Sequence, residues 1–145
     1  MNFDFLVENP IISISLGFIL GSIIGSFFNV CATRIPSGIS IISPPSSCPS
    51  CNNKILWFQN IPIVSWLLLK GKASCCNYKI PRRYFFMELG SGVIFAYLFY
   101  KFSFDGDLQI LFLSMIFASI MIIVSVIDLE TMLIPDRFSI GGSFV

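Results

Sequence analysis

Three long runs of apolar residues dominate the pattern of hydrophobic and polar positions along the chain. They cover residues 11–31, 84–100 and 108–127, and Glu88 is the one charged residue within them. A helix rises 1.5 Å per residue, so about 20 apolar residues cross the roughly 30 Å hydrocarbon core of a bilayer. The pattern therefore predicts an all-α polytopic membrane protein, with about three transmembrane helices and the lipid bilayer as a partner.

Small residues recur regularly within the first run. Gly17, Gly21 and Gly25 stand four positions apart. Small residues at this spacing share one face of a helix and allow a second helix to approach closely. We therefore expect the first span to pack against another helix through this face.

The residues between the first two spans are strongly basic. Residues 32–83 hold no Asp or Glu and seven of the nine Lys and Arg residues, which are Arg34, Lys54, Lys70, Lys72, Lys79, Arg82 and Arg83. A basic loop beside apolar spans is typical of the cytoplasmic side of a membrane, and its scattered charges argue against a nucleic-acid partner. We expect three segments: a tail and first helix (1–31), a cytoplasmic loop (32–83), and two further helices (84–145).

Composition agrees with this reading. Hydrophobic residues make up 55% of the chain and charged residues 12%, and the mean hydropathy is +0.85. No Lys or Arg precedes the first span, whereas cleaved signal peptides begin with positive charge. We therefore expect the first span to be retained.

Four of the five cysteines lie in the basic loop, and the chain has no histidine. Cys48 and Cys51 form a CxxC pair, and the adjacent Cys75 and Cys76 follow at a spacing found in zinc sites. A loop of this size buries little core, so a metal would stabilise it. Unbound thiols and a redox pair are the alternatives, although the βαβ context of a redox CxxC is absent.

Several carboxylates lie near the expected membrane surface. Asp128 ends the third span, Asp136 follows Pro135, and Glu88 lies near the start of the second span. We expect a carboxylate at this boundary to be partly desolvated, which favours its protonated form. Asp128 and Asp136 are unsuited to form a catalytic pair alone, since eight helical residues span about 12 Å.

The order of these features resembles that of the prepilin peptidases, or type IV leader peptidases. The resemblance rests on four motifs: GSFFNVCATRIP at 25–36, SCPSC at 47–51 with the stretch 57–71, RY at 83–84 through Glu88, and IDLETMLIPD at 127–136. The resemblance spans residues 17–145, which is nearly the whole chain.

The resemblance implies a multi-pass inner-membrane aspartic endopeptidase that cleaves the leaders of type IV prepilins or pseudopilins of type II secretion. Many members also methylate the new N-terminus with S-adenosylmethionine. Asp128 matches the first catalytic aspartate of the family, with Glu88, Asp136 and Arg83 in supporting positions. The family's second catalytic aspartate belongs to a later GxGD motif that these 145 residues lack, so we expect the chain alone to be inactive.

The cysteine loop departs from the family pattern. The first cysteine of the family's second CxxC would align with Ala73, and Cys75 is the residue available to replace it. We expect Cys48, Cys51, Cys75 and Cys76 to hold a structural Zn²⁺. Two alternatives to the peptidase are a protease-inactive remnant that acts as a methyltransferase, and a non-enzymatic membrane module that presents a zinc knuckle.

Overall fold

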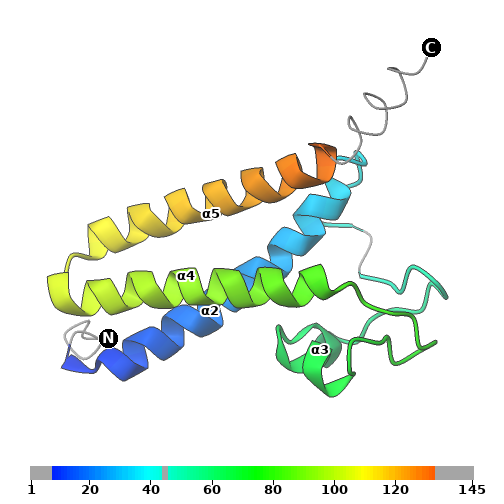
Figure 1. Cartoon of the computed structure of the whole chain (residues 1–145), viewed down its shortest axis with the longest axis horizontal. Helices are drawn as coiled ribbons and strands as arrows, with labels where there is room; N and C mark the ends of the chain where they lie inside the picture. The colour runs from blue at the N-terminus through cyan, green and yellow to red at the C-terminus, as the bar shows by residue number, and fades with distance from the viewer. Residues whose placement is uncertain (1–7, 44–45, 133–145) are drawn as a thin grey trace, which may run out of the picture.

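The computed structural model describes residues 8–43 and 46–132, and helices dominate it (Figure 1). Three helices are long and apolar enough to cross a membrane: α2 (Pro10–Arg34), α4 (Arg82–Asp105) and α5 (Leu108–Met132). Between α2 and α4 lie the 3₁₀ helix η1 (Trp57–Asn60) and the short helix α3 (Val64–Leu68). The described residues contain no strand beyond two isolated β-bridges. The predicted all-α architecture with three candidate spans is confirmed.

The helices extend beyond the apolar runs that predicted them. Helix α2 continues to Arg34 and α4 begins at Arg82, whereas we expected the loop to cover residues 32–83. Long basic side chains can reach the headgroup region from a helix end, so charge does not stop these helices. Proline does, because Pro36 follows the end of α2 and Pro81 precedes the start of α4.

The turn between α4 and α5 is short and capped on both sides. Gly106 adopts the left-handed conformation (φ +66°), and its N–H donates to the Phe102 carbonyl at 2.7 Å. The Asp107 carboxylate then accepts the N–H groups of Gln109 and Ile110 at 3.0 and 3.2 Å. The two helices therefore run antiparallel as a hairpin (Figure 1).

Helices α2 and α4 pack together through the predicted glycine stripe. A Cβ added at Gly17 would lie 2.7 Å from the Phe95 carbonyl oxygen, and one at Gly25 would lie 2.6 Å from the Ser91 hydroxyl. The buried Ser13 hydroxyl also donates to the Phe99 carbonyl at 3.1 Å. Only glycine permits so close an approach of two backbones, and the predicted role of the stripe is confirmed.

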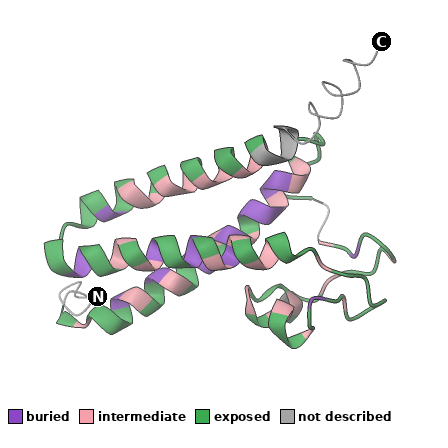
Figure 2. Cartoon of the chain, viewed as in Figure 1, coloured by how far each residue is buried: buried purple, intermediate pink, exposed green. Residues whose placement is uncertain are grey.

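Helix α5 contributes little to this core. Buried residues lie mainly along α2 and α4, whereas α5 is exposed or half-buried along most of its length (Figure 2). In the most apolar stretch of α5 only 6% of the residues are buried inside the protein, whereas 33% are buried in the corresponding stretch of α2. Among the described residues α5 has few packing partners, so its apolar side chains suit a lipid environment.

The helix ends sort into two groups. The C-terminal ends of α2 and α5 and the N-terminal end of α4 lie at the end of the molecule that carries the loop (Figure 1). The α4–α5 turn and the start of α2 lie at the opposite end. This arrangement brings the cysteines and Asp128 to the same end of the helices.

Candidate functional site

Cys48 and Cys51 lie in a tight turn closed by an isolated antiparallel bridge between Ser47 and Lys54. The Asn52 N–H donates to the Cys48 carbonyl at 2.8 Å, and the Cys48 N–H donates to the Asn53 carbonyl at 2.9 Å. Asn52 adopts a positive φ of 58°, a conformation that Asn tolerates better than most residues. The turn holds both thiols on one side of the loop.

A second turn repeats this pattern at Ala73–Tyr78. The Asn77 N–H donates to the Ala73 carbonyl at 3.1 Å, and the Ala73 N–H donates to the Tyr78 carbonyl at 2.7 Å. Asn77 has a φ of 56°, and an isolated bridge between Lys72 and Lys79 closes the turn. Ala73 therefore occupies the place of Cys48 in the first turn, Cys76 the place of Cys51, and Cys75 the place of Ser50.

The two turns bring four sulfur atoms together. The Sγ atoms of Cys48, Cys51, Cys75 and Cys76 all lie within 4.8 Å of one another. The Cys48–Cys76 and Cys51–Cys75 sulfur distances are 3.5 and 3.2 Å, and the adjacent Cys75 and Cys76 sulfurs are 3.8 Å apart. A tetrahedral zinc–thiolate site has sulfur–sulfur edges of about 3.8 Å. The cluster thus fits a metal ion, and both adjacent cysteines face it.

The thiols of the cluster differ in pKa because their surroundings differ. The backbone N–H groups of Cys51 and Ser50 donate to the Cys48 sulfur and lower its pKa to about 6. The Cys51 thiol is the main cause that raises the pKa of Cys75 to about 12, followed by burial and by the Cys48 and Cys76 thiols. Cys48 is therefore a thiolate at neutral pH, whereas a metal must displace the proton of Cys75.

Glu88 connects the loop to the membrane helices. Its side chain is only 8% exposed, and its Oε2 accepts the Ile63 N–H at 2.7 Å. Ile63 has φ +63° and ψ −54° and forms a γ-turn in which the Val64 N–H donates to the Pro62 carbonyl at 2.6 Å. Glu88 also hydrogen-bonds to Ser26 of α2. Glu88 lies beyond the first turn of α4, so a helix-terminus preference does not account for it.

Trp66 anchors α3 beside this carboxylate. Its indole packs against Phe85 of α4 with ring centroids 5.0 Å apart. It also covers Gly71, whose added Cβ would lie 2.9 Å from the indole ring. The Trp66 Nε1–H is buried and has no hydrogen-bond partner among the described residues. An unsatisfied buried donor of this kind is uncommon in native proteins.

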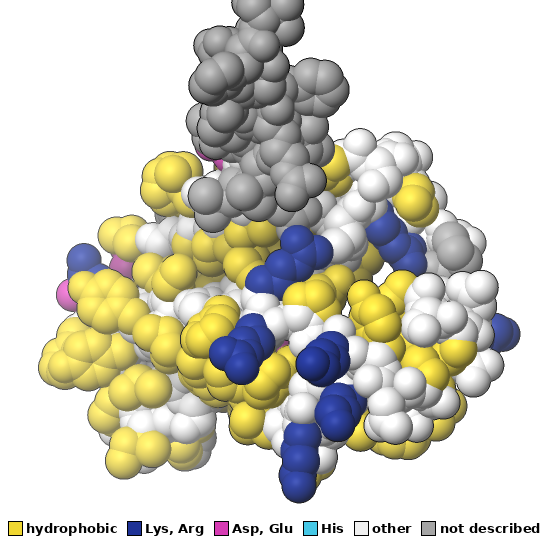
Figure 3. All heavy atoms as spheres, turned by 45° about the vertical axis from the view of Figure 1, so that its right-hand side comes forward, with side chains coloured by type: hydrophobic (Ala, Val, Ile, Leu, Met, Phe, Trp, Pro, Cys, Tyr) yellow, Lys and Arg dark blue, Asp and Glu magenta, His cyan; other side chains and the backbone are white. Residues whose placement is uncertain are grey.

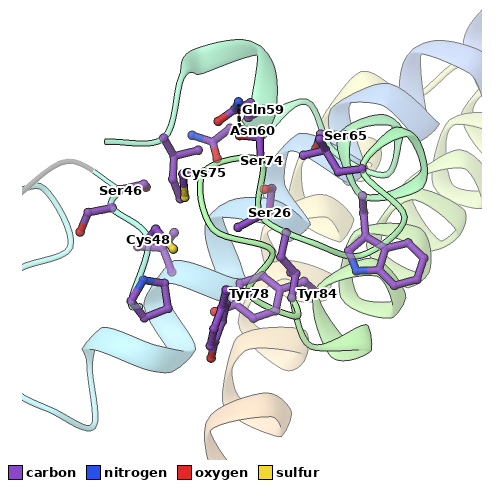
Figure 4. A pocket seen from close by; sticks show the side chains of 18 of the residues that line it. Ser26, Ser46, Cys48, Gln59, Asn60, Ser65, Ser74, Cys75, Tyr78 and Tyr84 are labelled. Atoms are coloured by element: carbon purple, nitrogen blue, oxygen red, sulfur yellow. Dashed lines mark hydrogen bonds between the residues drawn. The ribbon is translucent and has the colours of Figure 1, made fainter. Parts of the chain in front are cut away.

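A cavity of about 820 Å³ separates the loop from the helices (Figure 4). Ser26 of α2 and Tyr84 of α4 line it on the helix side, while Gln59, Ser74 and Cys75 line it on the loop side. The Gln59 Nε2 donates to the Ser74 hydroxyl at 2.7 Å, which joins η1 to the second cysteine turn. The cysteine cluster, the loop and the cavity therefore form one connected structure.

The other candidate residues lie around this end of the molecule. Arg83 lines the cavity, and its guanidinium lies 5.4 Å from the Tyr84 ring centroid. Asp128 lies near the end of α5, and its side chain is exposed on the protein surface. Asp136 lies outside the described residues.

Lys and Arg side chains gather at the same end. Figure 3 shows several of them on the face that turns forward when the loop end is brought toward the viewer. Arg34 in the last turn of α2 donates to the Ser40 carbonyl at 3.0 Å, which holds the start of the loop against the helix end. Lys and Arg side chains thus form a basic surface at this end, and three of them, Arg34, Lys54 and Arg83, also line the cavity.

Two polar residues of the site, Asn29 and Ser26, were not predicted from the sequence. The buried Asn29 lies within the GSFFNV motif, and its Nδ2 donates to the Tyr84 carbonyl at 3.2 Å. Ser26 of the same motif reaches Glu88 and the cavity. A polar side chain in an uncharged span is itself a signal, because lipid leaves it unsatisfied.

Comparison with known proteins agrees with this architecture. The family model described as "Bacterial Peptidase A24 N-terminal domain" matches residues 19–102. A prepilin leader peptidase/N-methyltransferase of Klebsiella pneumoniae is 35% identical over 143 residues, covering 94% of this chain and 61% of the relative. A protein of the same name from Bacillus subtilis is 40% identical over 127 residues, covering 88% and 50%.

A third such relative, from Myxococcus xanthus, is 32% identical over 133 residues, covering 92% of this chain and 38% of the relative. The chain thus spans about half the length of the curated relatives it matches. No solved structure is significantly similar to it. The family match covers more than half of the chain, including most of α4 and the whole cysteine loop, and the chain therefore belongs to the bacterial peptidase A24 N-terminal domain family.

Proposed function

We propose that this chain is the N-terminal part of a membrane aspartic endopeptidase that removes the leader peptide of type IV prepilins or pseudopilins. The observation that carries the proposal is the match to relatives named prepilin leader peptidase/N-methyltransferase across 88–94% of the chain. The structure is compatible with it, because α5 presents Asp128 at the end that also holds the basic loop.

In this proposal Asp128 is one of two carboxylates that activate water. One carboxylate takes a proton from water, whose oxygen then bonds to the scissile carbonyl carbon, while the protonated partner donates to the carbonyl oxygen. The peptide C–N bond then breaks, and the leaving nitrogen takes up a proton. The partner carboxylate belongs to the part of the relatives that this chain does not match. Glu88, Arg83 and Asp136 support the site.

We also propose a sidedness for the chain. The basic loop lies on the cytoplasmic side of the inner membrane, where positive charge accumulates in membrane proteins. The basic surface then faces headgroups and the cytoplasm and takes no nucleic acid. A prepilin would present its scissile bond at this surface, with its apolar helix in the bilayer.

The cysteine cluster is proposed to hold a structural Zn²⁺. Sulfur distances of 3.2–3.8 Å fit a four-thiolate site, which leaves no open position for a substrate. The metal would join the two turns of a loop in which few side chains are buried; Cys48 is one of them. When bound, S-adenosylmethionine would supply the methyl group for the second activity that the relatives' names state.

A chimera tests the proposed function. This chain replaces the matching half of the Bacillus subtilis relative, and the chimera is expressed in cells that lack their own prepilin peptidase. Cleavage of a prepilin at its leader junction is the expected result, detected as a mobility shift and by the mass of the new N-terminus. A chimera that is inserted and stable but leaves the prepilin uncut contradicts the proposal and favours a non-enzymatic zinc-bearing module.

A further inference from the structure

The apolar surface of α3 is not explained by the cysteine cluster or by Asp128. Val64, Leu67 and Leu68 stand three and four positions apart, so their side chains share one face of α3. They are 48%, 55% and 76% exposed, and Ile61 just before the helix is 41% exposed. These four residues form the α3 apolar face. Exposed apolar side chains that cluster in this way mark a surface that contacts a membrane or a partner.

The opposite face of α3 docks beside the part of α4 that enters the bilayer. The ring centroids of Trp66 and Phe85 are 5.0 Å apart, and the Ile63 N–H donates to the Glu88 carboxylate at 2.7 Å. Phe85 and Glu88 lie about 4.5 and 9 Å along α4 from Arg82, since a helix rises about 1.5 Å per residue. The 24 residues of α4 are about 36 Å long, which exceeds the roughly 30 Å hydrocarbon core by about one turn. The α3 apolar face therefore lies at the depth where headgroups meet acyl chains.

This face continues the apolar outer surfaces of α2 and α4. On one side, Phe85 meets Phe86 of α4 with ring centroids 5.6 Å apart, and Phe86 is 63% exposed. On the other side, Ile61 lines a hollow of about 450 Å³ together with Ile23 and Phe27 of α2, whose side chains are about half exposed. The apolar surfaces of the loop and of two spans thus adjoin, and the bilayer that surrounds the spans is the partner nearest to all of them.

Lysines flank the α3 apolar face. Lys70 and Lys72 follow α3 closely, and an isolated bridge pairs Lys72 with Lys79. All three are exposed, and residues 56–82 contain no Asp or Glu. Figure 3 shows Lys and Arg side chains among hydrophobic ones at this end of the molecule. Lysines beside an apolar surface extend their ammonium groups to the headgroups, and anionic lipids attract such clusters, so an apolar face with a basic rim fits an anionic lipid surface.

We propose that the α3 apolar face inserts into the leaflet on the loop side, and that Lys70, Lys72 and Lys79 bind the headgroups of anionic phospholipids. A helix as short as α3 is held at this depth by its contacts with α4. Ile63 adopts φ +63°, a conformation that is costly for a β-branched residue, and its hydrogen bond to Glu88 stabilises it there. The insertion would fix the loop, its cysteine cluster and the cavity against the membrane surface. It depends neither on leader cleavage nor on which side of the membrane carries the loop.

Cross-linking to lipid tests the proposal in the whole chain, reconstituted into vesicles of phosphatidylcholine and phosphatidylglycerol in equal amounts. Leu68→p-benzoylphenylalanine places a photoreactive ring at the most exposed position of the α3 apolar face. On irradiation it should attach to lipid at least about five times as often as Ser50→p-benzoylphenylalanine, in the polar first cysteine turn. Phe117→p-benzoylphenylalanine, on the exposed surface of α5, is the positive control. Mass spectrometry identifies the attached lipid.

The identity of the attached lipid tests the lysines. At position 68, phosphatidylglycerol should exceed phosphatidylcholine at least about twofold, because each nearby lysine attracts anionic lipid. Combining Lys70→Gln, Lys72→Gln and Lys79→Gln should lower this ratio to that found at position 117, and thermal unfolding verifies that every variant is folded. Labelling at position 68 as weak as at position 50, cross-links from position 68 to a second copy or to the other half of the chimera, or an unchanged lipid ratio without the lysines would each overturn the proposal.

Discussion

At the scale of single residues, the two cysteine turns explain how adjacent cysteines can serve one metal. Their backbone hydrogen bonds match, so Ala73 takes the position of Cys48, and Cys75 reaches the cluster from the position of Ser50. The Cys75 sulfur lies 3.2 Å from that of Cys51. Under the proposed function, Cys75 would therefore supply the thiolate that Ala73 cannot supply from the position matched to Cys48.

This replacement predicts a compensating pair of substitutions. Cys75→Ser should lower zinc affinity at least about tenfold, because it removes one of four thiolates. Adding Ala73→Cys to that variant should restore binding, since Ala73 occupies the position matched to Cys48. Competition with a chromogenic chelator measures the affinity, and Cys31→Ala, outside the cluster, is the control. Full affinity in Cys75→Ser alone would show that Cys75 is not a ligand.

The thiol pKa values predict how metal affinity depends on pH. Cys48, with a pKa of about 6, is already ionised at neutral pH, whereas Cys75, with a pKa of about 12, must release a proton to the solvent. Metal affinity should therefore rise with pH across the neutral range. As the pH falls toward 6, the affinity should drop more steeply, because Cys48 then also becomes protonated. Chelator competition between pH 5.5 and 8.5 measures this trend, and a flat profile would contradict it.

At the scale of secondary-structure elements, the contact between α2 and α4 determines the arrangement of the helices. The glycine stripe of α2 allows α4 to approach so closely that a Cβ at Gly17 would lie 2.8 Å from the Phe99 ring. Asn29 ties the C-terminal part of α2 to the first turn of α4 through the Tyr84 carbonyl. The loop that joins these two helices is thus held at both of its ends.

Glycine substitutions test whether α2 and α4 pack through the glycine stripe. Gly21→Ala places a methyl group against the Ser91 carbonyl and should destabilise the helix pair by about 1–3 kcal/mol. Gly90→Ala is the matched control, because a Cβ there meets nothing within 4 Å. Thermal unfolding in detergent micelles measures both. Equal melting temperatures for the two variants would show that α2 and α4 do not pack through this face.

The elements differ in how far the sequence predicts them. Lipid requires long uninterrupted apolar spans, so α2, α4 and α5 followed from hydropathy with errors of a few residues at their ends. The loop has no such apolar run, and its turns depend on hydrogen bonds between residues such as Cys48 and Asn53. The contact between Glu88 and Ile63, 25 positions apart, forms only when the loop docks. The four cysteines were therefore predictable as a cluster, but the cavity beside them was not.

At the scale of the whole molecule, one end carries nearly all of the chemistry. The loop, the cysteine cluster, the cavity and Asp128 lie at one end of the helices, and the short α4–α5 turn lies at the other (Figure 1). A membrane around the helices would separate these two ends. Under the proposed function, the substrate and the metal would then lie on the same side of the membrane.

The positive-inside distribution predicts which side this is. In spheroplasts, a membrane-impermeant maleimide should label an Asp105→Cys variant at position 105, in the turn region opposite the loop. The native Cys75 and Cys76, both exposed, should react only after the membrane is permeabilised and zinc is removed. Peptide mass mapping identifies the labelled cysteine. Labelling of the loop cysteines in chelator-treated, sealed spheroplasts would contradict this orientation.

The most direct test of the account compares two aspartates in the chimera with the Bacillus subtilis relative. Asp128→Asn should lower the rate of leader cleavage at least about 100-fold, because a neutral amide neither accepts a proton from water nor donates one as an acid. Asp105→Asn, the same change at the opposite end of the helices, should leave the rate within about twofold. Near-normal cleavage by a stable, inserted Asp128→Asn chimera would contradict the account.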